Sequence, residues 1–235
     1  MNFFKRLEGI FFSPKLVFES LAEKPIWVDI LIVLLIALSV YSLLIAPYAK
    51  NEQIQMTKES TKLKERMGED RFNQLVARME GPTTTWKVIQ TAVGAPLYLI
   101  LALVLQSLVL LMFGRFVSTQ GSFKQLFSAL VHASAVNVLL GNAVRLVLVL
   151  MRKSVMQTTT SLALLFPKME VTSTAFMALA RVDFFQLWLF GILAYGLAAI
   201  LKIDIKKALF ISYTVWFLKA LLNIGLGILF MSFLR

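Results

Sequence analysis

Five long apolar runs dominate the pattern of hydrophobic and polar positions along the chain. They cover about residues 26–46, 93–116, 125–151, 184–201 and 208–234. A transmembrane α-helix needs about 20 predominantly apolar residues to cross the hydrocarbon core of a bilayer, and each run is close to or above that length. The pattern therefore predicts an all-α, polytopic membrane protein with five transmembrane helices in a single membrane domain, residues 1–235.

Two segments outside these runs also have helical patterns. Residues 1–25 mix aromatic and charged side chains, and Ser13-Pro14 is typical of a helix start. This amphipathic segment is predicted either to lie in the headgroup region of the membrane or to pack on the bundle. Residues 49–86 alternate acidic and basic residues at helical spacing, which predicts one or two helices outside the membrane, broken near Gly68.

A narrow apolar stripe crosses this polar helical loop. Its members are Phe72, Leu75, Val76 and Met79. Such a stripe either packs within the loop or forms a face on which another protein docks. The sequence leaves both interpretations open.

The third apolar run carries more polar residues than a lipid-facing helix. At 100° per residue, Asn137 and Arg145 lie within about 80° of each other, on a stripe that also includes Ser134 and Gly141. An arginine at the centre of a membrane helix costs about 2.5–3.5 kcal/mol on insertion scales, so it needs a partner. We therefore expect an ion pair between Arg145 and Asp183, which precedes the fourth run.

Further polar groups lie in the second, third and fifth runs. Lys219 and Asn223 are spaced i, i+4 in the fifth run, and they complete a candidate intramembrane polar network. Its members are Asn137, Arg145, Asp183, Lys219 and Asn223. Ionisable groups at this depth mark either a functional path or internal packing, and both interpretations stay open. His132 points away from the stripe, at the depth of Gln106, and we expect these two to form a hydrogen bond.

Composition and charge exclude several classes of function. The chain is 58% hydrophobic, with a net charge of +11, no cysteine and one histidine. Without thiolates or paired histidines we expect no metal site and no cofactor. No nucleic-acid-binding motif accompanies the basic charge, so we expect it to meet anionic lipid instead. No catalytic motif is present either, and we expect no enzymatic activity.

The distribution of basic residues bears on orientation. Nine Lys and Arg residues lie on the side of the first residue, in short segments: Lys5, Arg6, Lys15, Lys24, Arg115, Lys124, Lys202, Lys206 and Lys207. The opposite side carries thirteen in longer loops. Because short loops weigh most in the positive-inside rule, we expect a cytoplasmic N-terminus and a C-terminus on the opposite side.

Several short stretches, taken in order, resemble the Yip family, named for Ypt/Rab-interacting proteins. They are Phe11-Phe12-Ser13-Pro14-Lys15-Leu16-Val17-Phe18 followed by Pro25-Ile26-Trp27, Gly94-Ala95-Pro96-Leu97, Gly121-Ser122-Phe123-Lys124-Gln125-Leu126, Ala133-Ser134-Ala135, Asp183-Phe184-Phe185-Gln186-Leu187-Trp188, Gly196, and Lys206-Lys207-Ala208. The resemblance covers almost the whole chain except the polar helical loop and residues 152–177. One departure is Asn137, which follows Ala135-Val136 where many relatives have a proline.

The resemblance implies five spans, a cytoplasmic N-terminus and no catalysis. Eukaryotic members resemble trafficking factors that engage Rab GTPases and shape membranes, but nothing in this sequence supports a GTPase partner. The bacterial branch implies a protein of the cytoplasmic (inner) membrane that binds and helps assemble or modulate other membrane proteins, such as an export transporter. A second copy of the chain is a further candidate partner. The alternatives are a transporter or channel for small solutes or ions, and a membrane-shaping protein.

Overall fold

The protein is a bundle of long helices. The computed structural model describes residues 1–156, 160–166, 168–169 and 173–234, the last five of these as backbone alone. Its α-helices are α1 (Phe3–Phe12), α2 (Pro14–Glu23), α3 (Val28–Glu59), α4 (Thr61–Met67), α5 (Glu69–Glu80), α6 (Thr85–Arg115), α7 (Phe123–Ala133), α8 (Asn142–Arg152), α9 (Thr174–Arg181), α10 (Phe184–Leu201) and α11 (Ile205–Leu234). A π-helix, η1 (Val136–Gly141), joins α7 to α8, and a 3₁₀ helix, η2 (Leu162–Leu165), precedes α9.

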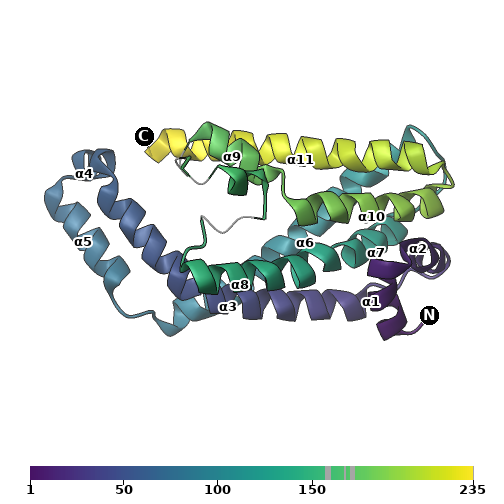
Figure 1. The fold of residues 1–235 in the computed structure, drawn as a ribbon, viewed down its shortest axis with the longest axis horizontal. Helices are drawn as coiled ribbons and strands as arrows, with labels where there is room; N and C mark the ends of the chain where they lie inside the picture. The colour runs from purple at the N-terminus through teal and green to yellow at the C-terminus, as the bar shows by residue number, and fades with distance from the viewer. Residues whose placement is uncertain (157–159, 167, 170–172, 235) are drawn as a thin grey trace.

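Five of the described helical segments are long and apolar enough to cross a membrane. They are α3, α6, the continuous stretch Phe123–Arg152, α10 and α11. They run side by side along the long axis of the molecule, and the two termini lie at opposite ends (Figure 1). The prediction of an all-α, five-span membrane protein is therefore confirmed.

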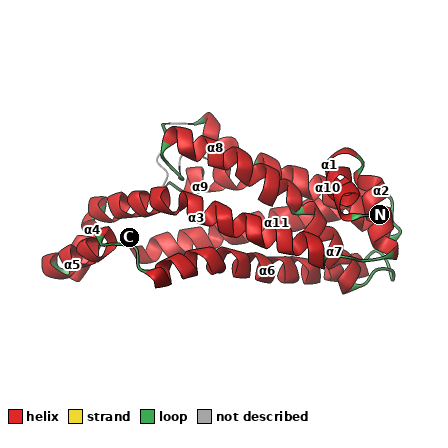
Figure 2. Cartoon of the chain, turned by 90° about the horizontal axis from the view of Figure 1, so that it is seen from below, coloured by secondary structure: helices red, strands yellow, loops and turns green. Residues whose placement is uncertain are grey.

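The first span continues far beyond its apolar run. α3 has 32 residues, so it is about 48 Å long at 1.5 Å per residue, and Pro47 lies inside it. Its polar end forms an arm with α4 and α5, and we call Lys50 to Gly81 the arm. The arm extends past the bundle at one end (Figures 1 and 2). The helix is interrupted at Ser60 and again at Gly68, where φ is 78°, and these two interruptions separate the three helices of the arm.

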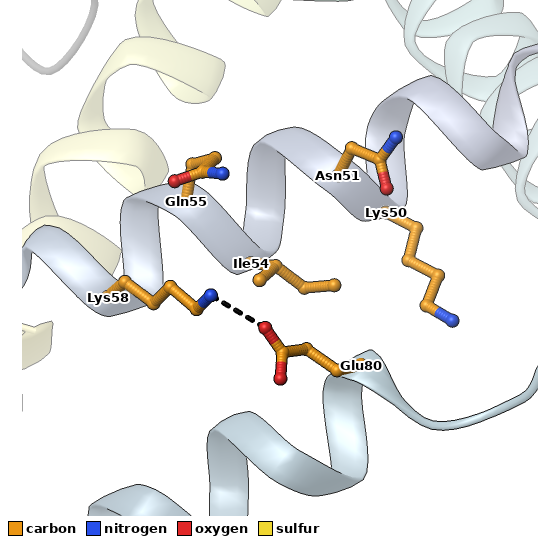
Figure 3. A pocket seen from close by; sticks show the side chains of 6 residues that line it. All are labelled: Lys50, Asn51, Ile54, Gln55, Lys58 and Glu80. Atoms are coloured by element: carbon orange, nitrogen blue, oxygen red, sulfur yellow. Dashed lines mark ion pairs between the residues drawn. The ribbon is translucent and has the colours of Figure 1, made fainter.

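The apolar stripe of the arm is used within the arm. Phe72 of α5 is 6% exposed and Ile54 of α3 is 7% exposed, while Leu75, Val76 and Met79 are half-buried. Polar contacts close the same seam. Lys58 pairs with Glu80 at 2.6 Å (Figure 3), and the Lys50 ammonium donates to the Gly81 carbonyl at 2.7 Å. Phe72 is therefore packed within the arm, and Leu75, Val76 and Met79 are partly covered by their own chain.

A proline in the second span is matched by a serine in the first. Pro96 lies inside α6 and has no N–H, so the Ala92 carbonyl one turn earlier lacks its usual donor. The Ser39 hydroxyl of α3 lies 2.8 Å from that carbonyl oxygen and 3.0 Å from the Leu35 carbonyl oxygen of its own helix. This contact satisfies a backbone group that lipid could not.

The two N-terminal helices pack on the bundle. Val17, Phe18 and Leu21 of α2 are fully buried, and α2 lies against α7 and α10. In α1, Arg6 is buried and pairs with Asp29 at the start of α3. The same helix leaves two aromatic side chains uncovered, since Phe4 is 76% and Phe12 is 81% exposed.

The entrance to the third span is fixed by a tight turn. Gly121 has φ of 88°, and a Cβ there would lie 2.9 Å from the Leu201 side chain, so only glycine fits this position. Ser122 and Gln125 then form a reciprocal capping box that starts α7. The Gln125 amide also donates to the Ala22 carbonyl at 2.6 Å, which ties the third span to the end of α2.

Candidate functional site

The third span contains a wide helical turn at its centre. In η1 the backbone N–H of Asn142 donates to the Asn137 carbonyl, five residues earlier, rather than four. A π-helix rotates less per residue than an α-helix, so it brings Asn137 and Arg145 closer in angle than the roughly 80° of an ideal α-helix. The wide turn thus gathers the polar side chains of this span onto one side.

Arg145 is the centre of a polar cluster. Its guanidinium donates to the side chains of Asn137, Asn142 and Asp183 at 2.9 Å each, and to the Thr160 hydroxyl at 3.1 Å. The contact with Asp183 is the expected ion pair, and it joins the third span to the start of the fourth. We call these five residues the Arg145 cluster.

Asp183 is held as firmly as Arg145. One of its carboxylate oxygens, Oδ1, accepts from Arg145 and from the backbone N–H groups of Phe185 and Gln186, at 2.9 and 3.1 Å. Asp183 is therefore the N-cap of α10, where a negative charge is favoured. Its other oxygen, Oδ2, accepts from the Thr160 hydroxyl.

The cluster is largely enclosed by apolar groups. The side chains of Arg145 and Asp183 are only 16% and 12% exposed. The guanidinium carbon lies 5.5 Å from the centre of the Phe185 ring, within cation–π range. A Cβ on Gly141 would lie 3.0 Å from both Arg145 Nη1 and Phe185 Cγ, so the absence of a side chain there lets the ring and the guanidinium approach.

A second polar group consists of Lys219 of α11 and Gln186 in the first turn of α10. The Lys219 ammonium donates to Gln186 Oε1 at 3.1 Å and lies 5.6 Å from the centre of the Phe190 ring. Among the described residues Lys219 has no carboxylate partner. Because the Gln186 N–H bonds Asp183 while its side chain bonds Lys219, the two groups meet at α10 without direct contact.

The expected five-residue network is thus divided. Asn137, Arg145 and Asp183 belong to the Arg145 cluster, and Lys219 belongs to the second group. Asn223 joins neither, because its amide donates to the Lys219 backbone carbonyl of its own helix at 2.8 Å.

The expected hydrogen bond between Gln106 and His132 is wrong. The Gln106 amide donates to the Ala102 carbonyl at 3.0 Å, and His132 Nδ1 lies 2.8 Å from the Ser128 carbonyl. Each side chain thus bonds the carbonyl one turn earlier in its own helix, which is nearer than a neighbouring helix. His132 is fully buried, and its Nε2 has no partner among the described residues.

Sequence reasoning missed several members of these groups. Asn142 is spaced i, i+3 from Arg145 and Gln186 stands three residues after a capping Asp, so both spacings carried a usable signal. Thr160 lies in a loop, and no spacing rule connects it to Arg145. Arg6 also escaped notice, because its partner Asp29 stands in another helix.

The geometry of the Arg145 cluster suits holding helices together better than it suits catalysis. Both charges of the Arg145 cluster are paired, and the donors and acceptors face one another instead of an open cavity. The part of the chain that the structure describes contains no group of His, Cys, Asp and Glu side chains able to hold a metal ion. What the cluster does is connect α8, the loop at Thr160 and α10.

Comparison with models of protein families shows to which family the chain belongs. The model of the Yip1 domain matches residues 9–227, nearly the full length. The chain belongs to the Yip1 domain family. Comparison with curated proteins and with solved structures finds no match. The match includes the first four spans, most of the fifth and the Arg145 cluster, and it begins within α1 of this Yip1 family protein.

The stretches that carried the resemblance now have physical roles in the Yip1 fold. The turn at Gly121 to Gln125 starts α7 and binds α2. Asp183 caps α10, and Gly196 lets α10 approach α2, since a Cβ there would lie 3.1 Å from the Phe18 ring. The family signatures in this chain are thus largely contacts between helices.

Proposed function

We propose that this Yip1 family protein is a non-enzymatic membrane protein that binds other membrane proteins and helps to assemble or modulate their complexes, for example an export transporter. The observation that carries the proposal is the arm. It extends past the bundle as a helical element whose apolar stripe is partly covered, while its outer faces are exposed and charged. A charged projection suits recognition of a partner.

The exposed face of α5 is the part of the arm that we assign to docking. Arg71 and Arg78 are exposed, stand seven residues apart on one face of the helix, and lie about 100–120° around the helix from the buried Phe72. This revises the simplest docking model, in which the apolar stripe itself meets the partner. The expected partner surface is acidic, because it must complement two arginines.

The test is co-purification from native membranes. The double variant Arg71→Gln/Arg78→Gln removes the two charges without touching the packed seam, and Lys206→Gln/Lys207→Gln removes two exposed charges at the opposite end. The proposal predicts that the α5 variant inserts normally but loses its partners, while the control keeps them. Equal recovery of partners with both variants would exclude docking through this face. Deleting residues 51–80 is a poorer test, because Glu52 also binds the loop after α8.

Transport through the polar residues is a weaker alternative. Arg145 and Asp183 are engaged with each other and with neighbouring side chains, and Lys219 has a separate position. A conduction path would need these groups to face water. Liposome flux that Lys219→Leu and Asn137→Leu leave unaltered would argue against it.

Membrane shaping remains a second candidate because of α1. Phe4 and Phe12 are exposed at the N-terminal end, where wedge-like aromatic side chains enter the headgroup region. On this reading, the full-length protein remodels vesicles and Phe4→Ser/Phe12→Ser does not. Equal vesicle shapes with both proteins would count against this role.

We also propose a location in the bacterial cytoplasmic membrane, with the N-terminus in the cytoplasm. The basic residues of the short segments at the N-terminal end support this orientation. The check is protease accessibility in spheroplasts. Protease added from outside should cleave the arm, and an arm that stays intact would contradict this orientation.

A further inference from the structure

The loop after the third span returns into the thickness of the bundle. α8 ends at Arg152, and the Lys153 ammonium lies 5.4 Å from the centre of the Tyr48 ring, just past the apolar run of the first span. The Thr160 hydroxyl, in contrast, accepts from Arg145. Arg145 precedes Lys153 by eight residues, about 12 Å along the helix axis, so Thr160 lies back at the level that the Arg145 side chain reaches.

We call residues 160–166 and 173–180 the segment. Contacts at both of its ends hold it at the depth of Arg145. The Leu162 N–H donates to the Val182 carbonyl and the Phe184 N–H donates to the Thr160 carbonyl, each at 3.0 Å, which forms an isolated antiparallel bridge at the N-terminus of α10. α9 then lies alongside α11 rather than beyond its end (Figure 1). A Cβ on Gly227 would lie 3.4 Å from the Met177 sulfur, so α9 and α11 are in close contact.

The segment exposes apolar side chains at this depth. Leu165 is 70%, Phe166 47%, Leu162 42% and Leu164 41% exposed, whereas Ala163 faces inward and is buried. Residues 160–166 carry no charge, and neither do residues 173–180. The lipid-facing side of α11 continues this surface, since Leu226 is 55% exposed.

The backbone of the segment is suited to lipid. An irregular segment tolerates the membrane only if its own N–H and C=O groups are satisfied within the protein. Here the Leu164 N–H donates to the Ser161 carbonyl and the Phe166 N–H to the Ala163 carbonyl, at 3.0 and 3.1 Å. The Ser173 hydroxyl accepts from the Phe176 N–H and so caps α9.

We propose that residues 160–166 and 173–180 lie within the bilayer leaflet nearest the N-terminus of α10, and that membrane lipid covers Leu162, Leu164, Leu165 and Phe166. The segment is then a re-entrant element anchored on the Arg145 cluster. This explains why a charged pair stands at its base: the pair holds the entry and exit of the segment together.

The chain contains no cysteine, so single cysteines report directly on exposure to water. Leu165→Cys tests the segment. Asn73→Cys, at an exposed position of α5 at the same end, is the water-facing control, and Phe210→Cys, 75% exposed on α11, is the lipid-facing control. Each variant is purified, reconstituted at low density, and reacted with a membrane-impermeant maleimide supplied to both sides of the bilayer.

The proposal predicts that Leu165→Cys reacts about tenfold more slowly than Asn73→Cys and as slowly as Phe210→Cys, because the reactive thiolate does not form away from water. In denaturant all three should react alike. Labelling of Leu165→Cys within about twofold of Asn73→Cys would overturn it. Slow labelling in native membranes but fast labelling in the purified, reconstituted protein would also overturn it, because the cover would then be another protein. Leu165 is exposed, so its substitution leaves the packing intact; Leu164→Cys repeats the test at a neighbouring position.

Discussion

Arg145 shows how one residue in a membrane helix is made tolerable. Four side chains accept hydrogen bonds from its guanidinium, and one of them carries the opposite charge. With the charge neutralised and four of its five N–H groups bonded, the residue is stabilised by the protein itself. We therefore interpret Arg145 as a residue that holds helices together.

This interpretation predicts strong coupling between Arg145 and Asp183. Arg145→Leu should lower the free energy of unfolding by about 3 kcal/mol, since it leaves a mostly buried carboxylate without its cation. Asp183→Asn keeps the cap of α10 but leaves the guanidinium unpaired. The double variant should recover about 1–3 kcal/mol relative to the sum of the single losses, measured by reversible unfolding in mixed micelles. Strictly additive losses would show that the two groups do not interact.

Gly141 should tolerate no side chain. An added Cβ would press on both the guanidinium and the Phe185 ring, so Gly141→Ala should cost about 1–3 kcal/mol. Gly94→Ala is the matched control, because a Cβ there meets nothing within 4 Å and alanine favours a helix. Thermal denaturation should separate the two variants. Equal melting temperatures would mean that the packing around Gly141 is loose.

At the scale of elements, the first two spans are connected through a proline. Pro96 frees a carbonyl in α6, and Ser39 of α3 supplies a hydroxyl to it. The pairing is local and requires that the two helices keep their register. It therefore fixes how α3 and α6 sit against each other.

Ser39→Ala should cost about 1 kcal/mol in the wild-type background, because a carbonyl in the membrane loses its donor. In a Pro96→Ala background the restored N–H can satisfy that carbonyl, and the same substitution should cost clearly less. Unfolding free energies of the four proteins form the double-mutant cycle. A cost that does not depend on residue 96 would show that Ser39 does not serve the freed carbonyl.

The elements could be predicted from the sequence wherever one rule decided them. Long apolar runs fixed the spans, and the depth of Arg145 and Asp183 pointed to their ion pair. The wide turn η1 could not be predicted, because a π-helix depends on what packs around it rather than on propensity. His132 and Gln106 were misjudged because depth alone says nothing of the carbonyl one turn away.

At the scale of the molecule, polar and apolar surfaces are arranged by depth. The bundle encloses the Arg145–Asp183 pair, residues 160–166 expose leucines, and the arm carries exposed charges beyond the bundle. The extension of α3 to Glu59 was not foreseen, because its hydrophobic signal ends near residue 46 although the helix does not. This arrangement leaves the arm as the surface that we propose for recognition of a partner.

The most direct test of that claim is site-specific photo-crosslinking in living cells. A photoreactive side chain at Gln74, which is exposed and lies on the same face of α5 as Arg71 and Arg78, is compared with one at Phe210, on the lipid-facing side of α11. We predict that the Gln74 position forms an adduct with a discrete membrane protein, that Arg71→Gln/Arg78→Gln abolishes this adduct, and that the Phe210 position yields none. No protein adduct at Gln74, or an adduct that persists when both arginines are removed, would contradict the account.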